Sequence, residues 1–181
     1  MASMYFIAIV LPEHLDRIVL SHKQWMFDNY QCRVGLKSPA HLTLVPPFWL
    51  DESLEDGVRS DIDTICRRFA PFTITTNNFS AFKPRTIFIA TEENEVLKNV
   101  KKAADSVFGD GQRYKIRIDR RPFHPHITIA TRDMHKKIFF EAWPHFEEMI
   151  FRETWTAEGI SLLRHNQKNW DVVYTSQFSQ V

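Results

Sequence analysis

The sequence predicts an α+β fold with mainly antiparallel sheets in a chain of 181 residues. Segments of strand composition follow each other without an intervening helix near residues 72–93 and 155–178, which favours antiparallel pairing over a regular βαβ alternation. A four-residue pattern containing His and Thr also occurs twice, and each copy is closely followed by a helical pattern. Both observations indicate two related halves. No shift in composition marks a boundary, so residues 1–181 are predicted to form a single domain.

The chain is expected to begin with a buried strand and an amphipathic helix. Residues 4–12 are almost continuously apolar and end at a proline, as is typical of a buried strand. Apolar and aromatic side chains then recur at intervals of three and four, which predicts a helix. Its expected buried face consists of Leu15, Ile18, Val19, His22 and Trp25.

The next two elements are a strand and a helix. Residues 41–48 have strand composition, and the strand is expected to stop at Pro46 and Pro47 because proline has no N–H to donate to a sheet. The apolar spacing from Ser53 to Phe69 predicts the second helix.

The middle of the chain combines four predicted strands with one helix. Residues 72–82, 85–93, 114–120 and 126–130 have the composition or the alternation of strands. Residues 96–107 carry an apolar stripe that predicts the third helix, with a glycine just beyond its end.

The C-terminal part predicts one more helix and a hairpin. The helix is expected over about residues 132–150, with a break at Pro144. Residues 155–163 and 170–178 are expected to pair with each other. The whole chain then contains about eight strands and four helices.

The charge composition limits the classes of partner. The chain has 23 basic and 22 acidic residues, a net charge of +1. This balance argues against a protein held to nucleic acid by a broad basic surface. It leaves open a small anionic substrate or an RNA end bound by a local cluster.

Cysteine content and hydropathy predict the compartment. Cys32 and Cys66 form no CxxC or disulfide-scaffold pattern, so both are expected to be free thiols in a reducing compartment. The apolar run over residues 5–11 is too short to cross a bilayer. We therefore expect a soluble cytoplasmic protein with no membrane partner.

The repeated pattern presents the same pair of polar side chains twice. It reads His41-Leu42-Thr43-Leu44 in one copy, and "HITI" over residues 126–129 in the other. Residues two apart on a strand share a face, so each His lies beside a Thr while the apolar residues face the core. With 8 histidines in 181 residues, random placement predicts fewer than one His-x-Thr match. Chance placement on two half-buried strands is therefore the weaker explanation.

Two such histidines suit chemistry at phosphorus. An imidazole can donate or accept a proton near neutral pH, because its ordinary pKa is about 6.5. In-line displacement at a phosphate needs a base on the entering side and an acid on the leaving side. The threonine hydroxyls could donate hydrogen bonds to the other phosphoryl oxygens. This arrangement needs no cofactor or metal.

The motifs "HLTL" and "HITI", the proline within "HPHITIA" and the segment "RTIFIA" between them resemble the two-histidine (2H) phosphoesterase superfamily. The most similar branch is the bacterial 2′-5′ RNA ligase-like, or cyclic phosphodiesterase, group. The resemblance covers essentially the whole chain. It implies a bilobal fold of two pseudo-symmetric halves, with helices flanking the sheets and a central cleft.

The resemblance also implies an activity and its residues. The expected substrates are 2′,3′-cyclic phosphates or 2′-5′ phosphodiesters of RNA or nucleotides, with ligation as the reverse reaction. It implies catalytic roles for His41, Thr43, His126 and Thr128. The fold does not demand a partner subunit, so a monomer is expected.

A metal site is the main rival interpretation of the second motif. His124 and His126 form an HxH pair, which can bind metal on a strand. No HExxH, HxxxE or acidic partner motif accompanies the pair, so no metal site is predicted. Neither a GxSxG elbow nor a glycine-rich phosphate loop occurs. The remaining histidines are expected on helix faces or the surface: His14, His22, His135, His145 and His165.

Substrate-binding candidates lie close to the motifs. They are Arg85, which could hold a phosphate or sugar, Phe123, which could stack on a base, and His124 at the rim. The alternatives are a solvated surface charge for Arg85 and a core position for Phe123. Weaker candidates of the same two kinds are Arg120, Arg121, Arg132, Phe48 and Phe82.

Two other functions stay open at this point. One is a module that binds an RNA end without turnover, although two intact His-x-Thr pairs argue for an enzyme. The other is an enzyme of the same fold that acts on a different cyclic or bridging phosphodiester.

Overall fold

Two antiparallel sheets of four strands organise the computed structural model, which describes residues 1–109, 113–118 and 121–179. The first sheet has the order β2-β1-β7-β8, with strands β1 (Ala2–Val10), β2 (His41–Asp51), β7 (Gly159–His165) and β8 (Trp170–Gln177). The second has the order β5-β4-β3-β6, with strands β3 (Phe72–Phe82), β4 (Thr86–Thr91), β5 (His126–Ala130) and β6 (Thr154–Ala157). The mainly antiparallel α+β fold predicted from the sequence is confirmed.

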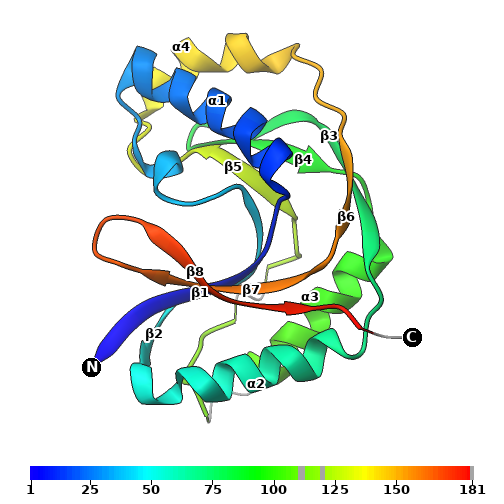
Figure 1. Cartoon of the computed structure of the whole chain (residues 1–181). Helices are drawn as coiled ribbons and strands as arrows, with labels where there is room; N and C mark the ends of the chain where they lie inside the picture. The colour runs from blue at the N-terminus through cyan, green and yellow to red at the C-terminus, as the bar shows by residue number, and fades with distance from the viewer. Residues whose placement is uncertain (110–112, 119–120, 180–181) are drawn as a thin grey trace.

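Each sheet is covered by two helices on one face. The helices are α1 (Glu13–Tyr30), α2 (Glu55–Cys66), α3 (Glu95–Phe108) and α4 (Lys136–Glu147). α1 and α4 contact the second sheet, whereas α2 and α3 contact the first, so the two pairs lie at opposite ends of the molecule (Figure 1). α1 follows a strand of the first sheet and α3 a strand of the second, so each crosses to cover the other sheet. Each sheet is therefore covered in part by a helix that follows a strand of the other sheet.

β2 continues through Pro46 and Pro47, so the prediction that they stop it was wrong. β2 lies at the edge of its sheet, where a missing N–H on the solvent side is tolerated. Its register against β1 also shifts here, because Val45 pairs with Ile7 while Phe48 pairs with Tyr5. The prolines therefore fall in a bulge, where the sheet makes no use of the donors that they lack.

The strand predicted over residues 114–120 is also wrong in its described part. Residues 114–118 form no strand, and Lys115 has a left-handed φ of 55° that interrupts extended backbone. Ile116 is nevertheless buried in the main core. The apolar periodicity of this segment therefore reflects packing of its side chains in the core rather than pairing in a sheet. Residues 119 and 120 lie outside the described residues.

The C-terminal elements differ from the prediction in two ways. α4 begins four residues later than expected, after a turn in which Arg132 has a φ of 51°, and Pro144 lies inside it without ending it. The hairpin is confirmed for β7 and β8. Residues 154–157, however, form β6 and pair with β3, so the chain changes sheets just before Gly159.

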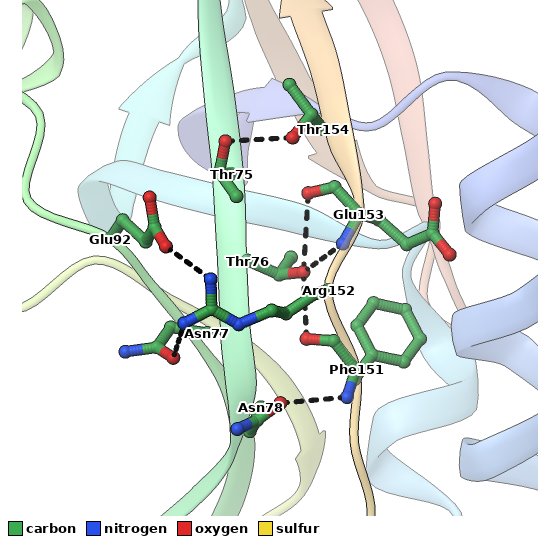
Figure 2. A network of polar contacts seen from close by, with 9 residues as sticks. All are labelled: Thr75, Thr76, Asn77, Asn78, Glu92, Phe151, Arg152, Glu153 and Thr154. Atoms are coloured by element: carbon green, nitrogen blue, oxygen red, sulfur yellow. Dashed lines mark hydrogen bonds and ion pairs between the residues drawn. The ribbon is translucent and has the colours of Figure 1, made fainter.

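A polar network fastens the segment before β6 to β3 (Figure 2). The buried Thr76 hydroxyl donates to the Phe151 carbonyl oxygen at 3.1 Å and accepts from the Glu153 N–H at 2.7 Å. Arg152 pairs with Glu92 at 2.9 Å. The Thr76 hydroxyl thus gives the Glu153 N–H an acceptor and adds a second donor to the Phe151 carbonyl oxygen, which also accepts from the Asn78 N–H at 2.9 Å. These contacts stabilise the outer edge of the second sheet.

Both cysteines are free thiols, as predicted, and the structure shows that both are buried. Within the described ranges, none of the helices combines the length and the apolar character that crossing a membrane requires.

Candidate active site

The register of β2 places the first motif on the face of its sheet that the helices leave open. Leu42 and Leu44 are fully buried in the main core beneath the helices. His41 pairs with Val10 and Thr43 with Ala8, so these polar side chains lie on the opposite face. A second, smaller cluster of buried apolar residues shares that face, built on Phe6, Ala8 and Leu163.

The second motif repeats this arrangement in the other sheet. Ile127 is fully buried in the main core. His126 pairs with Ala90 and Thr128 with Phe88 on the opposite face. The sequence prediction that each strand presents a His and a Thr together, away from its core, agrees with the register of both strands.

The fold brings the two motifs against each other. β2 and β5 are in contact although they belong to different sheets. The short 3-10 helix η1 (Val34–Lys37) packs against β5, with Gly35 close to the Ile129 backbone and the Val34 N–H bonded to the Asp133 carboxylate at 3.0 Å. His126 also interacts electrostatically with His41 and lowers its pKa. The contact between the two strands and this interaction indicate that the two imidazoles lie near each other.

Both imidazoles are held in the same way. Nδ1 of His41 lies 2.7 Å from the Pro39 carbonyl oxygen, and Nδ1 of His126 lies 2.7 Å from the His124 carbonyl oxygen. A carbonyl oxygen only accepts hydrogen bonds, so each Nδ1 carries a proton and donates it. In the neutral ring, Nε2 is then the nitrogen with a free lone pair. Each motif thus presents one basic nitrogen, fixed by a carbonyl two residues earlier in the chain.

Aromatic rings surround the two histidines. Phe6 lies 4.7 Å from His41 between ring centroids, and Phe88 lies 5.1 Å from His126. Both are buried. Phe82 lies 5.3 Å from His126 and is 42% exposed. These rings limit the access of water to the imidazoles and leave one exposed aromatic surface beside the second.

This environment favours uncharged histidines. Burial lowers the pKa of His41 to about 4, and the positive charges of Lys23 and His126 add to the effect. Burial likewise lowers the pKa of His126, with a further contribution from the charge of His124. In the free protein, therefore, both rings are mainly neutral at pH 7.

The three predicted substrate-binding residues lie in different surroundings. His124 is exposed, and its ring centroid lies 6.3 Å from that of His126. Arg85 is exposed in the turn between β3 and β4, where its N–H bonds to the Phe82 carbonyl oxygen at 2.8 Å. Phe123 packs against the main core, with the Lys101 ammonium 5.7 Å from its ring centroid. The structure thus gathers His124 at the histidine pair and sets Phe123 against α3.

The weaker substrate-binding candidates also lie in different surroundings. Phe48 is a core residue that stacks on Tyr5, whereas Phe82 is exposed at the site. Arg121 and Arg132 are exposed, and Arg120 lies outside the described residues. Among the residues that the structure describes, no group of three or more His, Cys, Asp or Glu side chains is arranged to hold a metal ion.

Sequence patterns alone did not identify Phe6, Phe88 or Lys23. The two phenylalanines lie within strongly apolar strands, where nothing separates a ring at the site from a ring in the core. Lys23 did carry a signal, because it interrupts the apolar stripe of α1 at a position that is almost fully buried.

The fold matches known structures along the whole chain. A protein of Thermus thermophilus superposes with a TM-score of 0.67 at 19% identity, covering 98% of both chains. Escherichia coli LigT complexed with 3′-AMP also gives a TM-score of 0.67, at 16% identity, covering 99% of this chain and 100% of LigT. These similarities define the fold.

The family follows from sequence comparison. Residues 15–169 match the model of the 2′-5′ RNA ligase superfamily, and the chain belongs to this family of two-histidine phosphoesterases. A candidate phosphoesterase of Geobacillus kaustophilus is 26% identical over 157 residues, covering 82% of this chain and 84% of that protein. An RNA 2′,3′-cyclic phosphodiesterase of Bacillus subtilis is 22% identical over 143 residues, covering 71% and 70%. The resemblance inferred from the two motifs is confirmed.

Proposed function

We propose that the chain is a metal-independent phosphoesterase that opens 2′,3′-cyclic phosphates or cleaves 2′-5′ phosphodiesters of RNA or nucleotides. One observation carries the proposal. Two histidines on strands in contact each have Nδ1 fixed by a backbone carbonyl 2.7 Å away, so that two Nε2 atoms are available for proton transfer. A base and an acid on two sides of one phosphorus are what in-line displacement needs.

The reaction proceeds by acid–base catalysis with no covalent enzyme intermediate. One imidazole takes a proton from water while the water oxygen forms a bond to phosphorus. The bond from phosphorus to a ribose oxygen breaks, and the other imidazole, protonated beforehand, gives its proton to that oxygen. One water is consumed and a phosphomonoester is formed. In the ligase direction a ribose hydroxyl replaces the water.

Thr43 and Thr128 have a supporting role. Each hydroxyl lies on the same strand face as its histidine and can donate a hydrogen bond to a non-bridging phosphoryl oxygen. Because water can partly replace a hydroxyl donor, removing a threonine should cost less activity than removing a histidine.

The relatives support this class of substrate. The Bacillus subtilis relative is an RNA 2′,3′-cyclic phosphodiesterase, and LigT has been crystallised with 3′-AMP. For this chain, a nucleotide or RNA end with a cyclic phosphate is proposed as the substrate, and His124, Arg85 and Phe82 are proposed to contact its base or sugar. Phe82 takes the stacking role that the sequence had suggested for Phe123, since Phe82 is exposed beside His126.

Turnover of nucleoside 2′,3′-cyclic phosphates in EDTA, followed by phosphorus NMR, tests the proposal. The wild type should convert the substrate, and His41→Ala and His126→Ala should each lower the rate by about 10²- to 10⁴-fold. His14→Ala is a matched control, because His14 is exposed on α1. Binding without conversion at any pH would favour an RNA-end-binding module, and activity that disappears in EDTA would contradict metal-independent catalysis. Conversion of only another type of phosphodiester would contradict the proposed substrate.

A further inference from the structure

Lys23 is a buried charge beside the site that the reaction scheme does not use. It lies on α1 and is 3% exposed, in a row of buried residues with Leu15, Val19 and Met26. Lysine is rarely buried so completely, because the ammonium loses its hydration. Burial lowers its pKa to about 8, and the Asp16 carboxylate partly opposes this effect. A hydrophobic residue could occupy this position with a smaller desolvation penalty. The presence of an amine therefore indicates a specific role.

The contacts of Lys23 and Asp16 converge on one short segment. Lys23 Nζ donates to the Ser38 carbonyl oxygen at 3.0 Å, and Asp16 Oδ1 accepts from the Ala40 N–H at 2.6 Å. Asp16 and Lys23 are seven residues apart, about two helical turns, and therefore lie on the same side of α1. The helix thus holds both ends of the segment from Ser38 to Ala40.

The residue between these two anchors is the one that orients His41. The Pro39 carbonyl oxygen accepts the hydrogen bond from His41 Nδ1 at 2.7 Å. We propose that Asp16 and Lys23 are positioning residues that hold the segment from Ser38 to Ala40, and through the Pro39 carbonyl fix the ring of His41. This inference rests on the proposed function for its effect on turnover. Its effect on the ring of His41 is independent of turnover.

Lys23 also acts on His41 through its charge. The groups that lower the pKa of His41 electrostatically are Lys23 on α1 and His126 on β5, in addition to burial. Removing the ammonium should therefore raise the pKa of His41 and make the ring easier to protonate. The hydrogen bond to the Pro39 carbonyl raises the same pKa, so loosening this bond would lower it. The loss of the charge and the loss of the anchor therefore shift the titration of His41 in opposite directions.

Two substitutions separate the hydrogen bond from the charge. Lys23→Gln keeps an N–H donor near the Ser38 carbonyl and removes the charge, whereas Lys23→Met removes both. Lys137→Met, at an exposed lysine on α4, is the matched control. The pKa of His41 is measured by NMR with labelled histidine, assigned with His41→Ala, and kcat and KM are measured with a nucleoside 2′,3′-cyclic phosphate in EDTA.

Lys23→Gln should raise the pKa of His41 by about half a pH unit or more, because the charge is lost. Lys23→Met should raise it less, because a looser hydrogen bond to the Pro39 carbonyl opposes that change. Lys23→Met should lower kcat by about 10- to 100-fold with little change in KM, because the ring is less well placed. Lys23→Gln should lose less activity than Lys23→Met. Asp16→Asn, which weakens the other anchor, should also lower kcat.

The results distinguish this inference from the proposed function. An unchanged pKa of His41 in both Lys23 variants, or a wild-type kcat in Lys23→Met, would overturn the inference while the function stood. If the wild type converts none of the substrates, the function fails, and a raised pKa of His41 still supports the role of Lys23 in setting the state of the ring. If Lys23→Met does not fold, Lys23→Gln supplies the titration.

Discussion

The contact between Gly35 and Ile129 should set the distance between the two histidine motifs, and Gly35→Ala tests this. A Cβ added at Gly35 would lie 2.3 Å from the Ile129 carbonyl oxygen and 3.4 Å from its carbon. Packed carbon and oxygen atoms approach to about 3.3 Å. η1 and β5 must therefore separate by roughly 1 Å. Backbone lies on both sides of this contact, so no side chain can move aside to relieve it.

The expected cost follows from this displacement. Overpacking a tight site destabilises a protein by about 1–3 kcal/mol. At about 2–4 °C per kcal/mol for a chain of this size, Tm should fall by about 2–12 °C. Ile129 lies on the strand of His126, and η1 leads directly into the segment before His41. A shift of about 1 Å between them should lower kcat by about 10- to 100-fold.

Gly57→Ala provides the control. Gly57 lies in α2, and the nearest atoms to an added Cβ are Arg113 Nη2 at 3.0 Å and the Tyr114 hydroxyl at 3.1 Å. The arginine end can move, and alanine favours the helix by up to about 1 kcal/mol. Its Tm and kcat should stay close to wild type. A Gly35→Ala variant with lowered Tm but unchanged kcat would refute the argument that this contact positions the motifs. An unchanged Tm would refute the packing argument itself.

Three further predictions follow from the pKa values and the polar contacts. Because burial lowers the pKa of both His41 and His126, kcat/KM should peak below pH 6.5, and a peak above pH 7.5 in EDTA would contradict the assignment. His41 takes up its proton near pH 6.5 when unfolded and near pH 4 when folded, so the free energy of unfolding should decrease as pH falls between these values. Urea unfolding should show a shallower decrease in His41→Asn, and the same slope in both proteins would exclude His41 as its source. Thr76→Val should cost about 1–3 kcal/mol by leaving the Glu153 N–H without its partner, with kcat unchanged. A loss of activity without a loss of stability would show that this network reaches the site.

The sequence predicts the motifs well because strand geometry is local. Alternation with period two places His41 beside Thr43 and opposite Leu42 whatever the rest of the chain does. The duplication of the motif also predicts a feature of the whole fold, because two similar strands at one site require two related halves. Arrangements that depend on a register, such as Phe88 beside Thr128, become visible only when β4 and β5 are paired.

The two wrong strand predictions also arise because sequence patterns are local. Pro46 and Pro47 argue against a central strand, and only the edge position and the bulge of β2 make them acceptable. Residues 114–118 have strand alternation but lack a strand to pair with, and Lys115 takes a left-handed conformation instead. In each case the local pattern is correct about which side chains are buried. It does not show which neighbouring strand is available for pairing, and this neighbour determines the backbone conformation.

Lys23 shows how a departure from a local rule indicates function. The decrease in its pKa from 10.5 to about 8 corresponds to a penalty of about 3 kcal/mol on the charged form. The penalty is fully present below pH 8 and disappears as pH rises toward 10.5, because the neutral amine is then present in both states. Leaving the Ser38 carbonyl without its donor would cost about 1–3 kcal/mol, so a methionine at this position should be no less stable at pH 7 and is expected to be slightly more so. Stability alone therefore does not favour lysine at position 23. An amine that holds the segment before His41 while its charge discourages protonation of that ring accounts for a residue that the fold itself does not require.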